Sequence, residues 1–283
     1  MGAFQFHEKR IVIDAVDMPN INKDVLEWCD VYGKVNFSYA ELPSRHVEKI
    51  VPIGPSFGVR IWPFFYAGVL ALSNWPKSKL RKKYFRSYIA NYFRQFRYRL
   101  PESQYFYTIP EKNYIFFLST IWKGFPKTNN YRMTFIKYCK SMESIEFEGG
   151  FAPQINNKAS GYDEYKISRR YGIAEYIEKT KRSMIVFNTP AVKDCLGWKL
   201  GEYLALGKAI ISTPLVREMP AKLIHGKHVH FTDGSEESIY EAIKLILNDQ
   251  EYRKTLEINA REYYLEYLKP ERVIDKLINL VVA

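Results

Sequence analysis

The chain has 283 residues, of which 47% are hydrophobic, enough to bury a sizeable core in one large or two small domains. This composition excludes a disordered protein, and three widely separated cysteines favour a reducing compartment, by default the cytoplasm, over a disulfide framework. The net charge of +11 arises largely within residues 77–99, which hold nine basic residues and no acid, so a charged partner is expected to meet one face of the protein.

The first hundred residues predict a small α/β unit. Strands are expected over 10–17, 31–38 and 48–57, and a helix over 22–30. Strands that alternate with helices favour a parallel sheet. The apolar run at 61–72 is interrupted by Pro63 and is too short to cross a bilayer, which needs about 20 residues.

The basic segment at 77–99 has the period of an amphipathic helix, with aromatic side chains on one half of the helical wheel and most basic side chains on the other. Three interpretations fit this pattern. An ordinary surface helix would pack its aromatic half on the protein. A helix bound to an anionic membrane surface would bury that half in the interface, with about 1 kcal/mol from each basic side chain near the surface. Binding to single-stranded nucleic acid is disfavoured, because no nucleic-acid-binding module is recognisable.

The remainder of the chain predicts a second α/β unit. Strands are expected over 113–122, 144–151, 184–190, 208–214 and 228–233. Helices are expected around 131–142, 171–183, 197–206, 235–249 and in the tail 251–282. The domain boundary is placed near 101–110, which gives an N-terminal domain over 1–109 and a C-terminal domain over 110–283.

The stretch from Asp194 to Ile211 carries the features that predict chemistry. Gly197 allows a tight turn after a strand, so the amides of Gly197, Trp198 and Lys199 become donors at a helix N-terminus, where phosphate binds. Lys199 adds charge, while Asp194 and Glu202 offer carboxylates to hydroxyl groups on either side of a diphosphate. A nucleotide sugar has that form. The alternative is a helix cap at Asp194 and a solvent-facing Glu202.

This stretch resembles a motif of GT-B fold glycosyltransferases, particularly retaining family four and its relatives. Asp194-Cys195-Leu196-Gly197, then Glu202, then residues 205–211 follow that family's Glu-Gly-Phe-Gly, Glu and Ala-x-Gly-x-Pro-Val-Ile pattern. The resemblance implies two Rossmann-like α/β domains with parallel sheets, the N-terminal one reduced, and it covers residues 113–283 well. It implies that Asp194 contacts the donor sugar and Glu202 the ribose. Lys123 and Thr120 would contact the phosphates, with Lys199 replacing the family's arginine.

The function implied by the resemblance is transfer of a hexosyl or related sugar, with retention, from a nucleotide sugar to a glycan or lipid-linked acceptor in polysaccharide or surface-glycan biosynthesis. Such an enzyme would be cytoplasmic and peripheral at the inner face of a membrane, which it would contact through residues 77–99. A partner chain would supply what the reduced N-terminal half lacks for the acceptor. The alternative is a non-catalytic, membrane-associated GT-B-like subunit or scaffold.

Other candidate residues have simpler explanations. His225, His228 and His230 lie close in sequence, but no further ligand cluster accompanies them, so no metal or other cofactor is expected. Cys195 has no base beside it and is expected to be a packing residue. Trp198, Tyr203 and Leu206 are expected to belong to the core.

Overall fold

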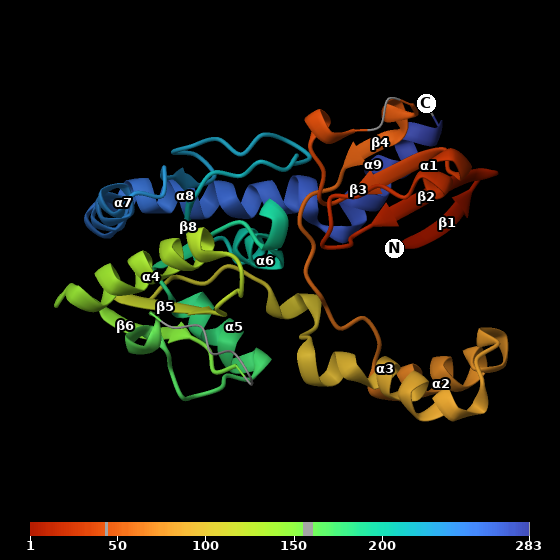
Figure 1. Cartoon of the computed structure of the whole chain (residues 1–283), viewed down its shortest axis with the longest axis horizontal. Coiled ribbons are helices and arrows are strands. Elements are labelled where there is room, and N and C mark those ends of the chain that lie inside the picture. The colour runs from red at the N-terminus through yellow and green to blue at the C-terminus, as the bar shows by residue number, and fades with distance from the viewer. Residues whose placement is uncertain (43–44, 155–160, 283) are drawn as a thin grey trace.

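The computed structural model describes residues 1–42, 45–154 and 161–282, which form two α/β domains and a projecting helical hairpin (Figure 1). The predicted fold class is confirmed: the strands pair mainly in parallel, and helices cover the sheets. The N-terminal domain has one sheet of four strands, and the C-terminal domain has a sheet of two strands and one of three that lie edge to edge, together called the C-terminal sheet. The N-terminal domain is the smaller one. Its four strands are β1 (Gly2–Phe6), β2 (Lys9–Asp14), β3 (Val31–Lys34) and β4 (Ile50–Pro52).

The N-terminal sheet has the order β1-β2-β3-β4, in which only β1 is antiparallel to its neighbour. The three predicted strands and the helix α1 (Lys23–Trp28) are confirmed, whereas β1 was not predicted. Its alternation of Phe4 and Phe6 is short, and it becomes a strand by pairing with β2 across a two-residue turn. Helix α1 packs on one face of this sheet through the buried Leu26.

The other face of the N-terminal sheet is covered by the last helix of the chain, α9 (Pro270–Val282). Leu277 of α9 is fully buried among strand residues, and a Cβ atom at Gly33 of β3 would lie 3.1 Å from its Cδ1 atom. Helix α8 (Gln250–Tyr263) runs into a π-helical turn, Tyr264–Leu268, and Pro270 then starts α9. The C-terminal tail therefore joins the two domains.

The described part of the C-terminal domain contains five strands: β5 (Tyr114–Ser119), β6 (Glu146–Phe151), β7 (Ile185–Asn188), β8 (Ala209–Ser212) and β9 (His230–Phe231). The parallel pair β5–β6 lies beside the parallel strands β7-β8-β9, with Met184 N donating to Tyr114 O at 2.8 Å. The chain thus passes from β5 to β6 on one side of β5, and then to β7 on the other side of β5. Ligands of such sheets bind where the winding reverses, outside the carboxyl ends of the strands.

Helices cover both faces of this second sheet. They are α4 (Pro126–Ser141) and α7 (Glu236–Asn248) on one face, and α5 (Ile173–Arg182), α6 (Trp198–Ala205) and α8 mainly on the other. Successive side chains of a strand point to opposite faces, so Ile115 and Phe117 join one core while Tyr114 and Phe116 join the other. Gly207, with φ of +61°, ends α6 as predicted.

The hairpin consists of α2 (Phe64–Asn74) and α3 (Phe85–Tyr98). The aromatic half of α3 packs on α2 and its flanks: the rings of Phe64 and Phe93 are 4.9 Å apart, and those of Trp75 and Tyr88 are 5.2 Å apart. The interpretation in which this half packs on the protein is therefore confirmed. Helix α2 was not predicted, because Pro63 was taken to interrupt the apolar run, whereas it immediately precedes the helix and occupies its N-cap position.

Because α9 packs on the N-terminal sheet through Leu277, we predict that removing this side chain destabilises the folded protein. Leu277→Ala should lower the free energy of unfolding by about 2–5 kcal/mol, because it leaves a cavity between α9 and the N-terminal sheet. Leu280→Ala, at a half-exposed position of the same helix, should change it by about 0.5 kcal/mol or less. Urea unfolding of both variants is the measurement. Equal effects would show that α9 does not depend on this contact.

Candidate functional site

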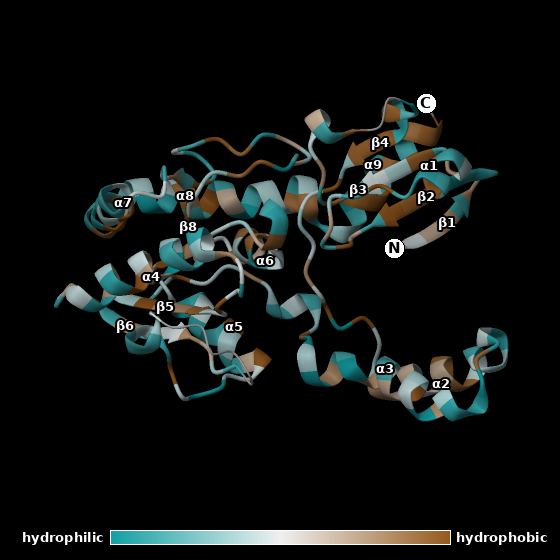
Figure 2. Ribbon diagram, in the orientation of Figure 1, coloured by the Kyte–Doolittle hydropathy of each residue, from teal (hydrophilic) through white to brown (hydrophobic). Residues whose placement is uncertain are grey.

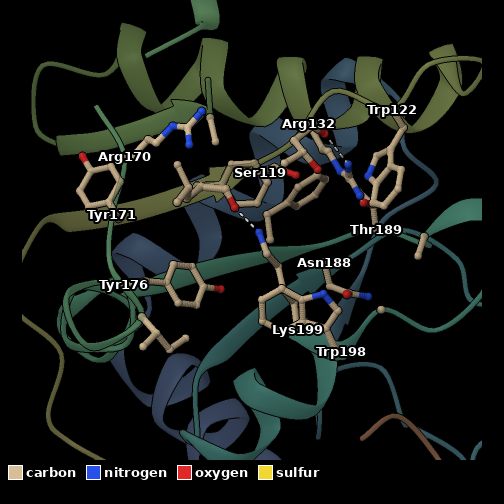
Figure 3. Close-up of a pocket in the computed structure, with 18 of the residues that line it drawn as sticks. Ser119, Trp122, Arg132, Arg170, Tyr171, Tyr176, Asn188, Thr189, Trp198 and Lys199 are labelled. Carbon is tan, nitrogen blue, oxygen red and sulfur yellow. Dashed lines mark hydrogen bonds between the residues drawn. The ribbon is translucent and has the colours of Figure 1, made fainter. Parts of the chain in front are cut away.

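A cavity of about 700 Å³ lies at the carboxyl ends of β5 and β7, at the point where the winding of the C-terminal sheet reverses (Figure 3). Its walls come from the ends of these strands, from α4, from the start of α5 and from the start of α6. The N-terminal part of the chain contributes Asp17, after β2, and Arg97 and Tyr98, at the end of α3. The cavity is therefore shared between the two domains and the hairpin.

The predicted turn forms one wall of this cavity. Gly197, Trp198 and Lys199 line it, and Gly197 is the N-cap of α6. Within the described residues, no side chain caps this helix end. The first residues of α6 therefore line the cavity, and an uncapped helix N-terminus favours a bound anion, so phosphate binding by these amides stays a prediction.

Lys199 extends from α6 across the cavity and donates a hydrogen bond from Nζ to the carbonyl oxygen of Leu118, at the end of β5 (Figure 3). Burial lowers the pKa of Lys199 to about 7, and the nearby positive charge of Arg132 acts in the same direction. Removal of an ammonium group from water disfavours its charged form. An anion in the cavity would restore that charge.

Arg132 enters the same cavity from α4. Its Nε donates to Thr189 Oγ1 and its Nη1 to the carbonyl oxygen of Thr120, both at 2.9 Å. The side chain is buried, which lowers its pKa to about 10. The sequence did not predict this arginine, because the resemblance places the phosphate-binding arginine in the loop after β5, which has none. The signal was present in α4, where Arg132 shares a helical face with the buried Asn129, Phe135 and Ile136.

Arg132 and Lys199 make this cavity suited to an anion. Neither forms an ion pair with a carboxylate within residues 1–42, 45–154 and 161–282. Buried cations without a counter-ion are costly, and a diphosphate is large enough to meet both. Arg170 lines the outer part of the cavity and adds a third positive charge.

The two predicted acids are not brought together around this cavity, and neither of them lines it. Asp194 is exposed, in a left-handed backbone conformation with φ of +57°. Glu202 is buried in α6, close enough to Lys199 and Tyr176 to affect their pKa values. The simpler alternatives fail as well, since Gly197 rather than Asp194 is the N-cap of α6 and Glu202 does not face solvent.

Burial dominates the chemistry of Glu202. It raises the pKa of this carboxyl to about 8, although Lys199 opposes the shift. Within the described part of the chain, Glu202 Oε2 has no hydrogen-bond partner. The hydroxyl group of Tyr176, a residue that lines the cavity, also lacks a partner at hydrogen-bond distance, although it lies close enough to Glu202 to act against the rise in the pKa of that carboxyl. The site therefore holds polar groups whose hydrogen-bonding capacity is unused in the described structure.

Of the remaining predicted residues, some line the cavity and others do not. Thr120 lines the cavity, whereas Lys123 is exposed and does not. Trp198 was expected in the core, but it is 47% exposed and lines the cavity, because it is the first residue of α6. Tyr203 and Leu206 are buried as expected. Trp122, which was not predicted, is held in the wall by two 2.9 Å hydrogen bonds with the side chain of Asn129.

The N-terminal domain fixes the position of the turn that precedes α6. Leu196 N donates to Asn36 Oδ1 at 2.7 Å. Arg217 binds Glu41 Oε2 with Nη1 at 2.5 Å and donates from Nη2 to the carbonyl oxygen of Lys193 at 2.8 Å. The backbone around Asp194 is thus held by Asn36 of the N-terminal domain and by Arg217, which is itself paired with Glu41 of that domain.

The three histidines make separate local contacts. His225 Nδ1 accepts from Phe231 N and His228 Nδ1 accepts from Ile224 N, both at 3.0 Å, while His230 Nδ1 lies 2.8 Å from Tyr252 Oη. Among the described residues, no group of three or more histidine, cysteine or acidic side chains is placed to hold a metal ion. Cys195 is buried and free, and burial raises the pKa of its thiol, as suits a packing residue.

Residues 170–263, about a third of the chain, match the family model described as glycosyl transferases group 1. This segment contains the turn at Gly197, Lys199 and all of α6. No curated protein sequence matches the chain significantly. The expected resemblance to GT-B glycosyltransferases is confirmed at the level of this match over residues 170–263 and of a shared fold.

Two structures of TarM share the fold at low sequence identity, and a third structure is similar at a lower TM-score. TarM has a TM-score of 0.52 and 8% identity, over 95% of this chain and 49% of TarM. A mutant of S. aureus TarM, in complex with fondaparinux, α-GlcNAc-glycerol and UDP, has a TM-score of 0.50 and 11% identity, over 90% of this chain and 44% of that chain. The C-terminal domain of LpcC from Francisella tularensis has a TM-score of 0.45 and 15% identity, over 60% of this chain and 98% of that chain. The chain spans about half the length of TarM.

The buried Glu202 predicts a pH-dependent stability difference. Its raised pKa means that the folded state holds a proton that the unfolded state loses above pH 4.5. The wild type should therefore lose stability relative to Glu202→Gln as pH rises from 5 to 7, by at most about 1.4 kcal/mol per pH unit. Lys199, with a pKa of about 7 in the folded protein, begins to lose its proton at the top of this range. Lys199 is present in both proteins, so the stability difference between them reports Glu202.

Chemical denaturation at several pH values measures this difference. Glu237→Gln, at an exposed position of α7, is the control and should show no such divergence. Parallel curves for the wild type and Glu202→Gln would mean that Glu202 is solvated in the folded protein.

Proposed function

We propose that this protein is a glycosyltransferase that moves a hexosyl or related sugar from a nucleotide sugar to a glycan or lipid-linked acceptor in polysaccharide or surface-glycan biosynthesis. The observation that carries the proposal is the cavity at the edge of the C-terminal sheet, where Arg132, Lys199 and an uncapped helix end converge. The glycosyl transferases group 1 segment contains two of these three features.

In the proposed complex, the diphosphate of the donor lies between Arg132 and Lys199 and meets the amides at the start of α6. Thr120 and Trp198 contact the donor from the wall. In a transfer that retains the anomeric configuration, the bond from the anomeric carbon to the diphosphate breaks. The acceptor oxygen then bonds to the anomeric carbon on the face of the sugar that the diphosphate leaves. The leaving diphosphate takes the acceptor proton, so no nucleophile from the protein is required.

Asp194 and Glu202 do not line the cavity, so the roles implied by the resemblance require that donor binding brings them to it. For Glu202, the unpartnered Oε2 supports a role toward ribose hydroxyls. For Asp194, exposure next to the turn leaves the carboxylate free to approach a sugar. Asp17, Arg97 and Tyr98 face the donor cavity from the N-terminal half, so acceptor contacts are expected there, with a partner chain adding further ones.

Binding of UDP tests the diphosphate site, and UDP is the first probe because it is present in the complex of the S. aureus TarM mutant. Arg132→Met and Lys199→Met should each weaken binding about tenfold or more, because each removes a buried charge-assisted contact. Lys123→Met should change it less than about twofold, since Lys123 does not line the cavity. Calorimetry measures the affinities, and CDP, GDP and ADP extend the panel.

A result in which Lys123→Met weakens binding while Arg132→Met and Lys199→Met do not would move the phosphate site out of this cavity and contradict the proposed arrangement. Circular dichroism of each variant shows whether the fold is kept.

The second candidate is a non-catalytic GT-B-like subunit or scaffold, and the absence of Asp194 and Glu202 from the cavity wall is the observation that favours it. An enzyme should slowly hydrolyse at least one nucleotide sugar of a panel, and Asp194→Asn should reduce this rate about tenfold or more without an equal loss of UDP affinity. Chromatographic detection of released nucleoside diphosphate is the measurement. Affinity for UDP without turnover of any donor would favour the scaffold.

A further inference from the structure

Helix α2 has an apolar surface that the protein does not cover. No charged residue occurs between Arg60 and Lys77, and only Ala67 and Ala71 of this helix are fully buried. Phe65 is 82% exposed and Leu72 is 62% exposed. A helix that is apolar on most sides is normally buried in a core or in lipid.

The hairpin cannot bury this surface by itself. Helix α3 occupies one side of α2 through the ring contacts described above, and Figure 1 shows the hairpin projecting from both domains. Phe65, Val69 and Leu72 fall within about 60° of one another on the helical wheel, and all three are exposed. We call these three residues the outer face of α2. Figure 2 shows hydrophobic residues along α2, beside the more hydrophilic α3.

The charged residues near the outer face of α2 indicate what kind of partner can cover it. No acidic residue occurs from Lys49 to Pro101, and the connection between α2 and α3 carries five exposed basic residues: Lys77, Lys79, Arg81, Lys82 and Lys83. A second copy of the hairpin would bring like charges together. An anionic lipid surface supplies both an apolar layer and negative headgroups.

We propose that the outer face of α2 inserts into the interfacial layer of an anionic membrane, with the basic connection on the headgroups. This deepens the proposed function, on which it rests for the membrane location, and it corrects the expected mode of contact. The aromatic half of α3 is occupied by α2, so α2 rather than α3 enters the membrane. None of the described helices is long and apolar enough to cross a bilayer.

The arrangement also connects the membrane contact to the donor cavity. Helix α3 runs from the basic connection to Arg97 and Tyr98, which line the cavity. Its 14 residues span about 21 Å, so an acceptor held at the membrane would meet the cavity about one helix length from the basic connection. This placement suits a lipid-linked acceptor.

Co-sedimentation with phosphatidylglycerol-containing vesicles tests the proposal. The wild type should bind them, bind neutral phosphatidylcholine vesicles far less, and dissociate as salt is raised. Phe65→Ser combined with Leu72→Ser should weaken binding about tenfold or more, because it removes the inserted surface. Lys82→Ser combined with Lys83→Ser should weaken binding mainly at low salt.

Matched control variants distinguish vesicle binding through the outer face of α2 and the basic connection from nonspecific adsorption of the protein to vesicles. Ile258→Ser with Leu280→Ser removes two exposed apolar residues elsewhere, and Lys9→Ser with Lys227→Ser removes two exposed charges elsewhere. Both should bind like the wild type. All substituted positions are exposed, so folding should persist, and circular dichroism checks it.

The proposal is overturned if the wild type does not bind anionic vesicles, or if the outer-face variant binds them as well as the wild type does. Loss of a dimer in that variant by gel filtration, without vesicle binding, would instead assign the outer face to a second copy and also overturn it. The vesicle assay contains no donor, so its failure is distinguishable from failure of UDP binding.

Discussion

The convergence of Arg132 and Lys199 in one cavity, with no carboxylate ion-paired to either in the described structure, is the constraint on which the functional argument depends. These cations come from α4 and α6, and they meet because the sheet winds in opposite directions from β5. Their hydrogen bonds go to Thr189 and to backbone carbonyls at the ends of β5. These two cationic side chains are therefore held at least partly buried in a concave site, where an anion interacts with them more strongly than in water.

The two domains depend on each other at this place. Asn36 and Arg217 fix the turn that precedes α6, while α9 returns from the C-terminal domain to cover the N-terminal sheet. The hairpin is the least integrated part, since the only residues of α2 and α3 that are fully buried are Ala67, Ala71 and Gln95, and the rings between the helices are only partly covered. Such a pair of helices is expected to gain stability from whatever covers the outer face of α2, because short helices depend on packing.

Glu202 shows that burial changes the chemical properties of a residue that a sequence motif predicts to bind a ligand. A carboxylate in this sequence position was expected to meet hydroxyl groups of a ligand, yet its pKa is raised by burial and one of its oxygens lacks a partner in the described part of the chain. A neutral, unpartnered carboxyl behind Lys199 is compatible with a ligand site that is completed on binding, and also with a degenerate one. Turnover of a nucleotide sugar distinguishes a functional site from a degenerate one.

The sequence by itself determined the alternation of strands and helices in the second half, the turn at Gly197, the end of α6 at Gly207 and the amphipathic nature of α3. These features depend on local periodicity and on backbone preferences of single residues, which neighbouring residues reveal. Only the tertiary structure decided that Arg132 reaches the cavity, that Glu202 is buried, that Trp198 is exposed and that α2 covers the aromatic half of α3. Each of these depends on contacts between residues far apart in the chain, and no local pattern specifies which helix face meets which strand end.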